Sequence, residues 1–139
     1  WTAALLALDA AVTIEGDDGS EQVPLEALVR ERRKGRMTSL QVQRRGNARW
    51  GDAHVARTPS DVPIVGAYAV VWAADGVVED ARVALCGASS VPVWVVDAVE
   101  LLVGHPLDEE RIGKAASAVL EEVEPTGDYL GSEAYWRAS

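Results

Sequence analysis

The chain has very few residues of several types, and each shortage argues against a class of protein. One cysteine in 139 residues leaves no internal disulfide framework and no cysteine-ligated cluster. Two histidines are too few for a histidine-rich metal site, so no metal site is predicted. No apolar run approaches the roughly 20 residues that span a bilayer, so no membrane contact is predicted. The cysteine usage fits a cytoplasmic location.

Catalytic motifs are also missing from the sequence. It contains no Walker loop, His-Glu-x-x-His pair, paired CxxC or nucleophile elbow. Cys86 could act as a nucleophile with His54 or His105 as its base, but a small side chain at a strand end is the simpler interpretation. Residues 87–90 could form an anion-binding nest, although their composition also suits a plain turn. We predict no catalytic residue.

The charge of the chain is unevenly distributed. Its net charge is −9, yet residues 30–49 carry a net +7 from eight basic residues and the single acid Glu31. Such a block can mark nucleic-acid contact. No aromatic residue interleaves the arginines before Trp50, and the rest of the chain is strongly acidic. We therefore predict a solvated loop or a surface for an acidic partner, and no nucleic acid.

The central third of the chain predicts a β-hairpin. Alternating apolar runs at Ile64–Trp72 and Val77–Leu85 flank Asp75-Gly76, and glycine accepts the positive φ of a tight turn. Upstream, Val12–Ile14 and Gln22-Val23 form a second hairpin in the prediction, followed by a helical turn from Pro24 and a strand at 37–43. Residues 44–59 are interpreted as a connector, with an extended piece near His54. Val93–Val96 is expected to extend or cap the sheet.

The last third of the sequence predicts helices. Asp97–Val103 predicts two turns that end at Gly104. Asp108 is a suitable N-cap, and apolar residues recur at helical spacing to Val123. Ser132–Arg137 predicts a last short helix. The predicted fold class is α+β: an antiparallel sheet of about three strands with helices packed on one face, preceded by a small α/β remnant.

The order of these pieces resembles a known family. Arg57, Asp61-Val62, the hairpin, Ala84–Gly87 and Pro92 are similar to the C-terminal domain of the flavin-binding (medium) subunit of the carbon monoxide dehydrogenase and xanthine dehydrogenase family, the molybdenum hydroxylases. Residues 98–107, 108–125 and 124–137 resemble its two helices and closing segment. Residues 4–28 resemble the last hairpin of its second flavin-binding lobe.

The resemblance implies three parts: residues 1–45 as a remnant of the second flavin-binding lobe, 46–59 as a connector, and 60–139 as the flavoprotein C-terminal-type domain. Members of the family bind FAD and relay electrons to it from an iron–sulfur subunit, while a molybdopterin subunit hydroxylates the substrate. Their FAD pyrophosphate is held by N-terminal glycine-rich loops, and this sequence has neither loop. The chain starts at Trp1, so we interpret it as a truncated or fragmentary relative.

Other departures from the family concern the flavin ring. Met37 matches the apolar residue that packs near the ring and is the one cofactor-binding candidate. Arg33, Gly35 and Gln43 replace the usual Pro-x-Glu and Pro, and a lysine near the flavin is replaced at Ala53 or His54. FAD is therefore expected in the parent family, whereas this chain alone is expected to bind none.

Two alternatives stay open beside a fragment of the oxidoreductase. The chain could be a free-standing descendant that lost FAD and acts as a binding or assembly module, or a flavin-free enzyme with a pocket near Met37, Trp50, His54 and Trp72. Unpaired strand edges left by the missing lobes predict a homodimer or a complex with another chain. The expected interface uses the 4–23 hairpin and the 37–43 strand, and it buries Leu5, Leu6, Leu8, Val12 and Ile14 or residues beside them.

Overall fold

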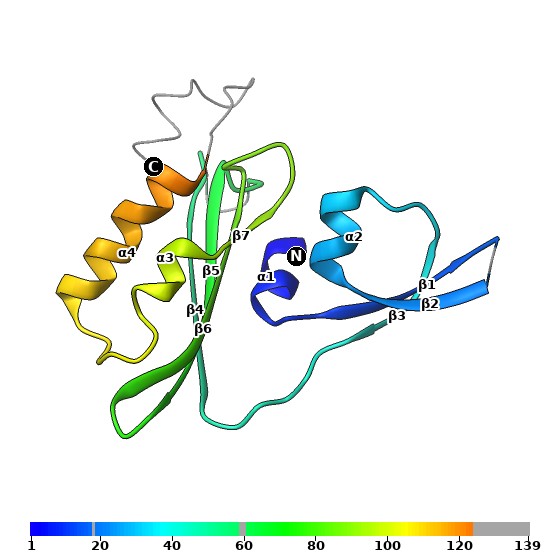
Figure 1. Ribbon diagram of the computed structural model, residues 1–139. Coiled ribbons are helices and arrows are strands. Elements are labelled where there is room, and N and C mark those ends of the chain that lie inside the picture. The colour runs from blue at the N-terminus through cyan, green and yellow to red at the C-terminus, as the bar shows by residue number, and fades with distance from the viewer. Residues whose placement is uncertain (18, 59–60, 124–139) are drawn as a thin grey trace.

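The computed structural model describes residues 1–17, 19–58 and 61–123 of the chain. Its described part contains two antiparallel sheets, with the strand orders β2-β1-β3 and β4-β5-β6-β7 (Figure 1). The strands are β1 (Ala11–Gly16), β2 (Gly19–Pro24), β3 (Arg36–Gln41), β4 (Ala48–Val55), β5 (Val65–Ala74), β6 (Val77–Cys86) and β7 (Val93–Val95). The α+β fold class predicted from the sequence is confirmed.

The N-terminal sheet is built around β1, which pairs with β2 on one side and β3 on the other. Helix α1 (Thr2–Ala7) precedes it, and α2 (Leu25–Glu31) follows Pro24 directly. Proline suits this position because its fixed φ and missing N–H are compatible with a helix start. Helix α2 ends at Glu31, and its C-cap residue Arg32 adopts a left-handed conformation with φ 50°.

The long hairpin of the second sheet forms around Asp75-Gly76, as the sequence predicted. Both residues have positive φ, 51° and 81°, which is the backbone geometry of a tight two-residue turn between twisted strands. β5 pairs along its length with β6, and β7 adds three residues to the outer side of β6.

Strand β4 corrects the interpretation of residues 44–59 as a connector, and it confirms the extended piece expected near His54. Eight residues pair with β5 in register from Ala48↔Trp72 to Val55↔Val65. All but Val55 are exposed, because β4 is an edge strand that makes backbone hydrogen bonds on one side and buries neither face. The strand therefore carries no apolar alternation that would reveal it in the sequence. It raises the sheet from about three strands to four.

Helices α3 (Asp97–Glu100) and α4 (Glu109–Glu122) follow the second sheet. The chain leaves α3 sooner than predicted and turns at Gly104, whose φ is 80°. The side chain of Asp108 accepts a hydrogen bond of 2.8 Å from the backbone N–H of Arg111, which confirms it as the N-cap of α4. The predicted helix at Ser132–Arg137 lies outside the described residues.

Helices cover both faces of the second sheet. α3 and α4 pack on one face, and α1 packs on the other, so the sheet stands between them in Figure 1. The sequence predicted helices on one face only. No helix among the described residues is long and apolar enough to cross a bilayer.

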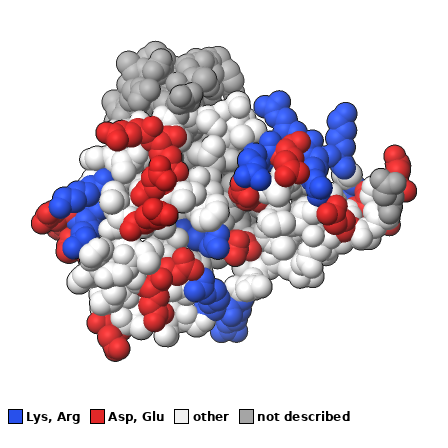
Figure 2. Space-filling view, viewed as in Figure 1, with Lys and Arg blue, Asp and Glu red and all other residues white. Residues whose placement is uncertain are grey.

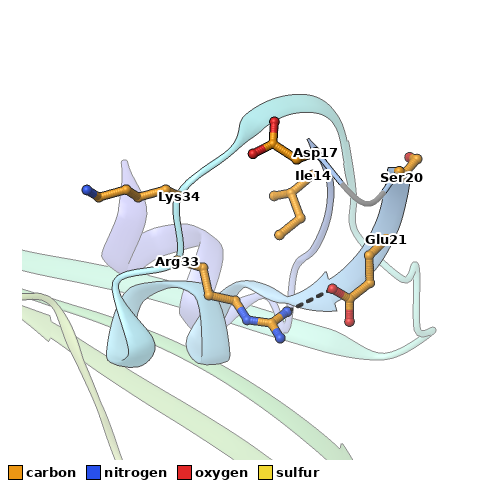
Figure 3. Close-up of a pocket in the computed structure, with 8 residues that line it drawn as sticks. Ile14, Asp17, Ser20, Glu21, Arg33 and Lys34 are labelled. Atoms are coloured by element: carbon orange, nitrogen blue, oxygen red, sulfur yellow. Dashed lines mark hydrogen bonds and ion pairs between the residues drawn. The ribbon is translucent and has the colours of Figure 1, made fainter.

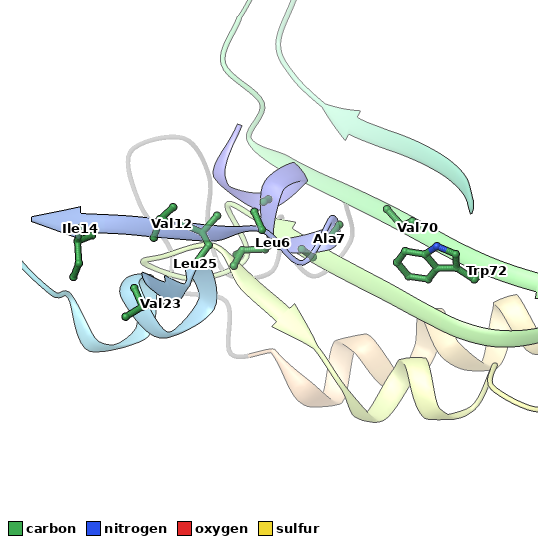
Figure 4. Close-up of a cluster of buried hydrophobic side chains, with 11 residues drawn as sticks. Leu6, Ala7, Val12, Ile14, Val23, Leu25, Val70 and Trp72 are labelled. Carbon is green, nitrogen blue, oxygen red and sulfur yellow. The ribbon is translucent and has the colours of Figure 1, made fainter. Parts of the chain in front are cut away.

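The largest hydrophobic cluster joins the two sheets (Figure 4). Leu6 and Ala7 of α1 lie between Val12 of β1 and the aromatic ring of Trp72 on β5. Ala3 and Ala7 of α1 are almost completely buried, and their small side chains let the helix lie close to the sheet. Burial of these apolar groups is the main favourable contribution to the packing of the two sheets.

This core corrects the expected association surface. Leu6, Val12 and Ile14 are buried within the chain's own core, with exposed fractions of 4%, 0% and 9%. They are therefore unavailable to a partner. The sequence correctly indicated that this segment is apolar. It could not show that α1 folds back onto β5 and β6 and buries these side chains within the chain.

Leu6 and Leu8 provide a matched test of this packing. We predict that Leu6→Ala lowers the free energy of unfolding by about 2–5 kcal/mol, because the substitution leaves a cavity in the core. Leu8 is 37% exposed, so Leu8→Ala should change the free energy by no more than about 0.5 kcal/mol. Urea unfolding followed by tryptophan fluorescence measures both. Equal effects of the two substitutions would contradict the placement of α1.

Candidate functional site

Several chemically versatile side chains share the α1-facing side of the second sheet. In the register of β4 and β5, Asp52 lies opposite Tyr68 and His54 lies opposite Gly66. Gly66 in turn lies opposite Cys86 of β6. Cross-strand partners project from the same face of a sheet, so these five residues form one patch, of which Tyr68 and Cys86 pack against the cluster that contains α1.

Gly66 makes room at the centre of this patch. A Cβ atom at position 66 would lie 2.9 Å from Sγ of Cys86 and 3.4 Å from the Tyr68 ring. Both approaches are closer than ordinary van der Waals contact, so only glycine allows the thiol and the ring to meet there. Cys86 is the sole cysteine of the sequence and is half-buried.

Tyr68 is the titratable group whose environment is most clearly altered among the described residues. Burial raises the pKa of its phenol above the usual 10.0, and the nearby Cys86 thiolate and Asp52 carboxylate raise it further. Sequence reasoning did not single out Tyr68. Tyr68 lies two residues from both Gly66 and Val70 in the predicted strand. Because side chains two residues apart on a strand share a face, this spacing could have placed it there.

The patch does not form a nucleophile–base pair. His54 and Cys86 lie on β4 and β6, separated by β5, which corresponds to roughly 10 Å at the usual strand spacing. His54 Nδ1 lies instead 3.8 Å from Asp52 Oδ2, and both side chains are about half exposed. His105 is remote from the patch, where its backbone C=O accepts a 2.9 Å hydrogen bond from Val78.

The four residues suggested for a pocket occupy different surroundings. Trp72 is buried against α1, with the Arg45 guanidinium 4.3 Å from its ring centroid. Trp50 and His54 lie on the open face of β4, and Trp50 is 77% exposed. Met37 lies on β3 of the other sheet, 52% exposed and opposite Ile14. None of the four lines any of the hollows described here.

A polar hollow of about 510 Å³ lies between the β1–β2 hairpin and the end of α2 (Figure 3). Arg33 bonds Glu21 across its mouth at 3.1 Å, while Asp17 and Lys34 stand on its rim. Its two basic and two acidic side chains balance, so the hollow has no preference for an ion of either sign. We therefore assign no ligand to this hollow.

A larger, apolar hollow of about 600 Å³ separates α4 from the second sheet. Its walls are alanine, valine, leucine and isoleucine side chains of β5, β6 and α4, including Ala67, Val71, Leu85, Ala116 and Leu120. The spacing of the apolar stripe on α4 predicted this face. The hollow shows that α4 stands away from the strands rather than filling the space above them.

The glycine- and serine-rich corner after β6 is a turn. Gly87 has φ 83°, and Ser89 Oγ donates to the C=O of Val91 at 2.7 Å. The backbone N–H of Val91 returns a 3.4 Å hydrogen bond to the same hydroxyl. The loop therefore satisfies its own polar groups, which favours the turn over the anion-binding nest.

Half of the basic block is neutralised within the chain. Arg30, Arg33, Arg36 and Arg45 form ion pairs with acidic residues of α2, β2, β1 and β6. Within the described residues, the other four basic side chains have no ion pair: Arg32, Lys34, Arg44 and Arg49. The free charge is thus concentrated near the end of α2 and at the start of β4.

The hairpin, the helices on both faces of the second sheet and the order of the elements define the class of the protein as an α+β domain. A family model, described as the CO dehydrogenase flavoprotein C-terminal domain, matches residues 53–139. That match covers more than half of the chain. The chain belongs to this family, which confirms the resemblance read from the sequence.

Individual relatives agree with the family. The chain is 29% identical over 144 aligned residues to the nicotine 6-hydroxylase medium subunit of Paenarthrobacter nicotinovorans. The alignment covers 97% of this chain and 50% of that protein. The fold of the chain is similar to carbon monoxide dehydrogenase from Hydrogenophaga pseudoflava, with a TM-score of 0.86 at 23% identity, covering 99% of this chain and 50% of that one. The fold is also similar to quinoline 2-oxidoreductase from Pseudomonas putida 86, with a TM-score of 0.82 at 22% identity, covering 99% of this chain and 50% of that one. The chain spans about half the length of these relatives.

The pH dependence of stability tests the raised pKa of Tyr68 in the patch. The folded chain holds the phenol proton above the pH at which the unfolded chain releases it, so stability should fall as pH rises past about 10. We predict a steeper fall for the native chain than for Tyr68→Phe, which has no proton to lose. Unfolding in urea at a series of alkaline pH values measures the difference. Parallel curves would contradict the raised pKa.

Gly66 and Cys86 provide a test by substitution. Gly66→Ala should lower the free energy of unfolding by about 1–3 kcal/mol, because the new methyl group overlaps Sγ of Cys86. Adding Cys86→Ala should restore part of this loss, and the double-mutant cycle gives the coupling. Gly51→Ala is the matched control, since no atom lies within 4 Å of a Cβ there. Additive effects at positions 66 and 86 would rule out the contact.

Proposed function

We propose that this chain is the C-terminal part of the flavin subunit of a molybdenum-hydroxylase-type oxidoreductase. The single observation that carries the proposal is the family match over residues 53–139, in a chain of which 97% aligns with half of a hydroxylase medium subunit. The parent activity would be FAD-linked electron transfer. Its partners would be an iron–sulfur subunit and a molybdopterin subunit, in the cytoplasm.

The residues present do not fit the whole of FAD. A pyrophosphate requires backbone N–H groups at close range, and glycine-rich loops normally supply them. This sequence contains no such loop. Met37 is exposed on an edge strand and is the one residue we propose for contact with the flavin ring.

A second candidate function is a binding or assembly module that works without FAD. The observation in its favour is the amount of apolar surface that faces hollows rather than other atoms of the described chain, above all between α4 and the second sheet. Strand edges support the same idea, because β3 and β4 each pair on one side only. Under either candidate we propose association with another chain or with a second copy through such edges.

The FAD affinity of the isolated chain tests the missing pyrophosphate site, an expectation shared by both candidates and by a third, the flavin-free enzyme. We predict that the isolated chain binds FAD no more tightly than the millimolar range, because it cannot hold the pyrophosphate. Isothermal titration with FAD, and with riboflavin as the phosphate-free control, measures this directly. Micromolar binding of FAD but not of riboflavin would reveal a phosphate site that the sequence does not suggest.

The product of the complete reading frame tests the leading candidate. If the gene encodes the two glycine-rich loops upstream, the purified product should show the visible absorption bands of bound flavin and co-purify with iron–sulfur and molybdopterin subunits. A complete product that lacks both loops and shows no flavin bands would favour the binding module instead.

A further inference from the structure

Strand β4 is a long edge strand that pairs only with β5 in the described part of the chain. Its eight residues, Ala48–Val55, make it the longest of the four edge strands among the described residues. Its register with β5 is continuous, and the strand contains neither a proline nor a bulge. Proteins usually protect an exposed edge with such features, because unpaired N–H and C=O groups can pair with an added strand. The outer edge of β4 is therefore open to a partner strand.

The two faces of β4 differ in chemistry. Consecutive side chains of a strand project from opposite faces of the sheet. The residues on the face toward α4 are Arg49, Gly51, Ala53 and Val55. Those on the face toward α1 are Ala48, Trp50, Asp52 and His54. A strand added to β4 would also direct alternate side chains to these two faces, so each set must suit a different surface.

The face toward α4 is apolar and open beside β4. The β5 partners of Gly51 and Ala53 are Ala69 and Ala67, and both line the apolar hollow under α4. No atom lies within 4 Å of a Cβ atom placed on Gly51. Ile112, on the wall that α4 forms, is 48% exposed. Large apolar side chains on an added strand would lie over the small residues of β4 and cover the open side of the hollow.

The face toward α1 offers a negative charge beside an exposed indole. Asp52 is the one acidic residue of β4, and Trp50 is 77% exposed. Among the described residues, Asp52 has one ion-pair contact, with Nδ1 of His54 at 3.8 Å, and it is an ion pair only when the imidazole is protonated. A lysine or arginine of an added strand could pair with the carboxylate and lie on the indole ring.

The charge around the second sheet also favours a cationic partner. Arg45 and Arg82, on the same face, already pair with acidic side chains. Residues 1–47 carry as many basic as acidic side chains, whereas residues 48–123 carry five basic and twelve acidic ones, a net −7. Figure 2 shows acidic side chains spread over α3 and α4 and basic ones gathered around α2 of the other sheet. This surplus of negative charge attracts a positively charged segment.

We propose that the outer edge of β4 binds an extended segment of another polypeptide in which large apolar residues alternate with Lys or Arg. The segment adds a strand to β4. Its apolar side chains lie over Gly51 and Ala53, and its basic side chains lie on the other face beside Trp50 and Asp52. The proposal deepens the association through strand edges proposed above. Its failure would leave the assignment to a flavin subunit unchanged, because that assignment rests on the family match.

Selection from a displayed library of random short peptides tests the proposal on the full chain. We expect the enriched peptides to alternate large apolar residues with Lys or Arg, and calorimetric titration of synthetic copies to give micromolar affinity. Alternate N–H groups of a strand point to opposite sides, so methylation of one alternate set of backbone nitrogens should abolish binding and methylation of the other should not. Equal binding of the two methylated forms, or selection of no such peptide, would overturn the proposal. A dimer of the chain in sedimentation equilibrium that no selected peptide dissociates would assign the edge to a second copy instead.

Charge reversal on β4 tests the basic half of the segment. Asp52→Lys should weaken binding of a selected peptide about tenfold or more, and replacing the peptide's basic residues with glutamate should restore affinity for this variant. Glu79→Lys is the matched control, since it makes the same charge change at an exposed residue of β6, which β5 separates from β4. Equal losses for the two variants, or no restoration by the acidic peptide, would show that the peptide binds elsewhere.

A substitution on α4 tests the apolar half. Ile112→Ser should weaken binding of the same peptide roughly threefold or more, because it removes an apolar side chain from the wall of the hollow. Leu101→Ser is the control, since Leu101 is 44% exposed and does not line the hollow. Equal affinities of the two variants for the peptide would contradict the placement of its apolar side chains.

Discussion

The packing of α1 against the second sheet is the contact on which the rest of the described structure depends. α1 is a six-residue helix and would not be stable alone. Its buried face, with Leu6 and Ala7, lies between β1 and the Val70–Trp72 part of β5, and the buried residues of both sheets form one cluster. The N-terminal sheet has three strands and limited core of its own. Its stability is therefore coupled to that of the second sheet through this helix.

Two arginine–tryptophan contacts reinforce the same junction. Arg82 of β6 lies 4.8 Å from the ring centroid of Trp94 and pairs with Asp9, just after α1, at 3.1 Å. Arg45, in the segment between the sheets, stacks on Trp72 and pairs with Asp80 of β6. Both guanidinium groups contact an aromatic face and a carboxylate at once, which a lysine could not match in geometry. They fix orientation more than they add stability, because the ion pairs are partly exposed.

The sequence predicted the elements whose signals are local. Asp75-Gly76 specifies its own turn through positive φ, and Asp108 specifies the start of α4 through a cap that the next residues satisfy. The sequence indicated only an extended piece near His54 and not the eight residues of β4, because pairing with β5 leaves the side chains of this strand exposed. The burial of Leu6 and Trp72 also could not be predicted from neighbouring residues in the sequence. Whether an apolar residue lines a pocket, a partner surface or a core depends on which distant segment covers it, and here that segment is α1.

The same limit applies to the candidate site. Histidine, cysteine and aromatic residues could be identified one by one, but their grouping follows from strand register. The register places Asp52, Tyr68 and Cys86 on one face, with Gly66 as the gap between them. It also separates His54 from Cys86 by a full strand, which removes the nucleophilic pairing that the sequence left open. What the described chain presents to a partner is thus determined by its uncovered edges and grooves.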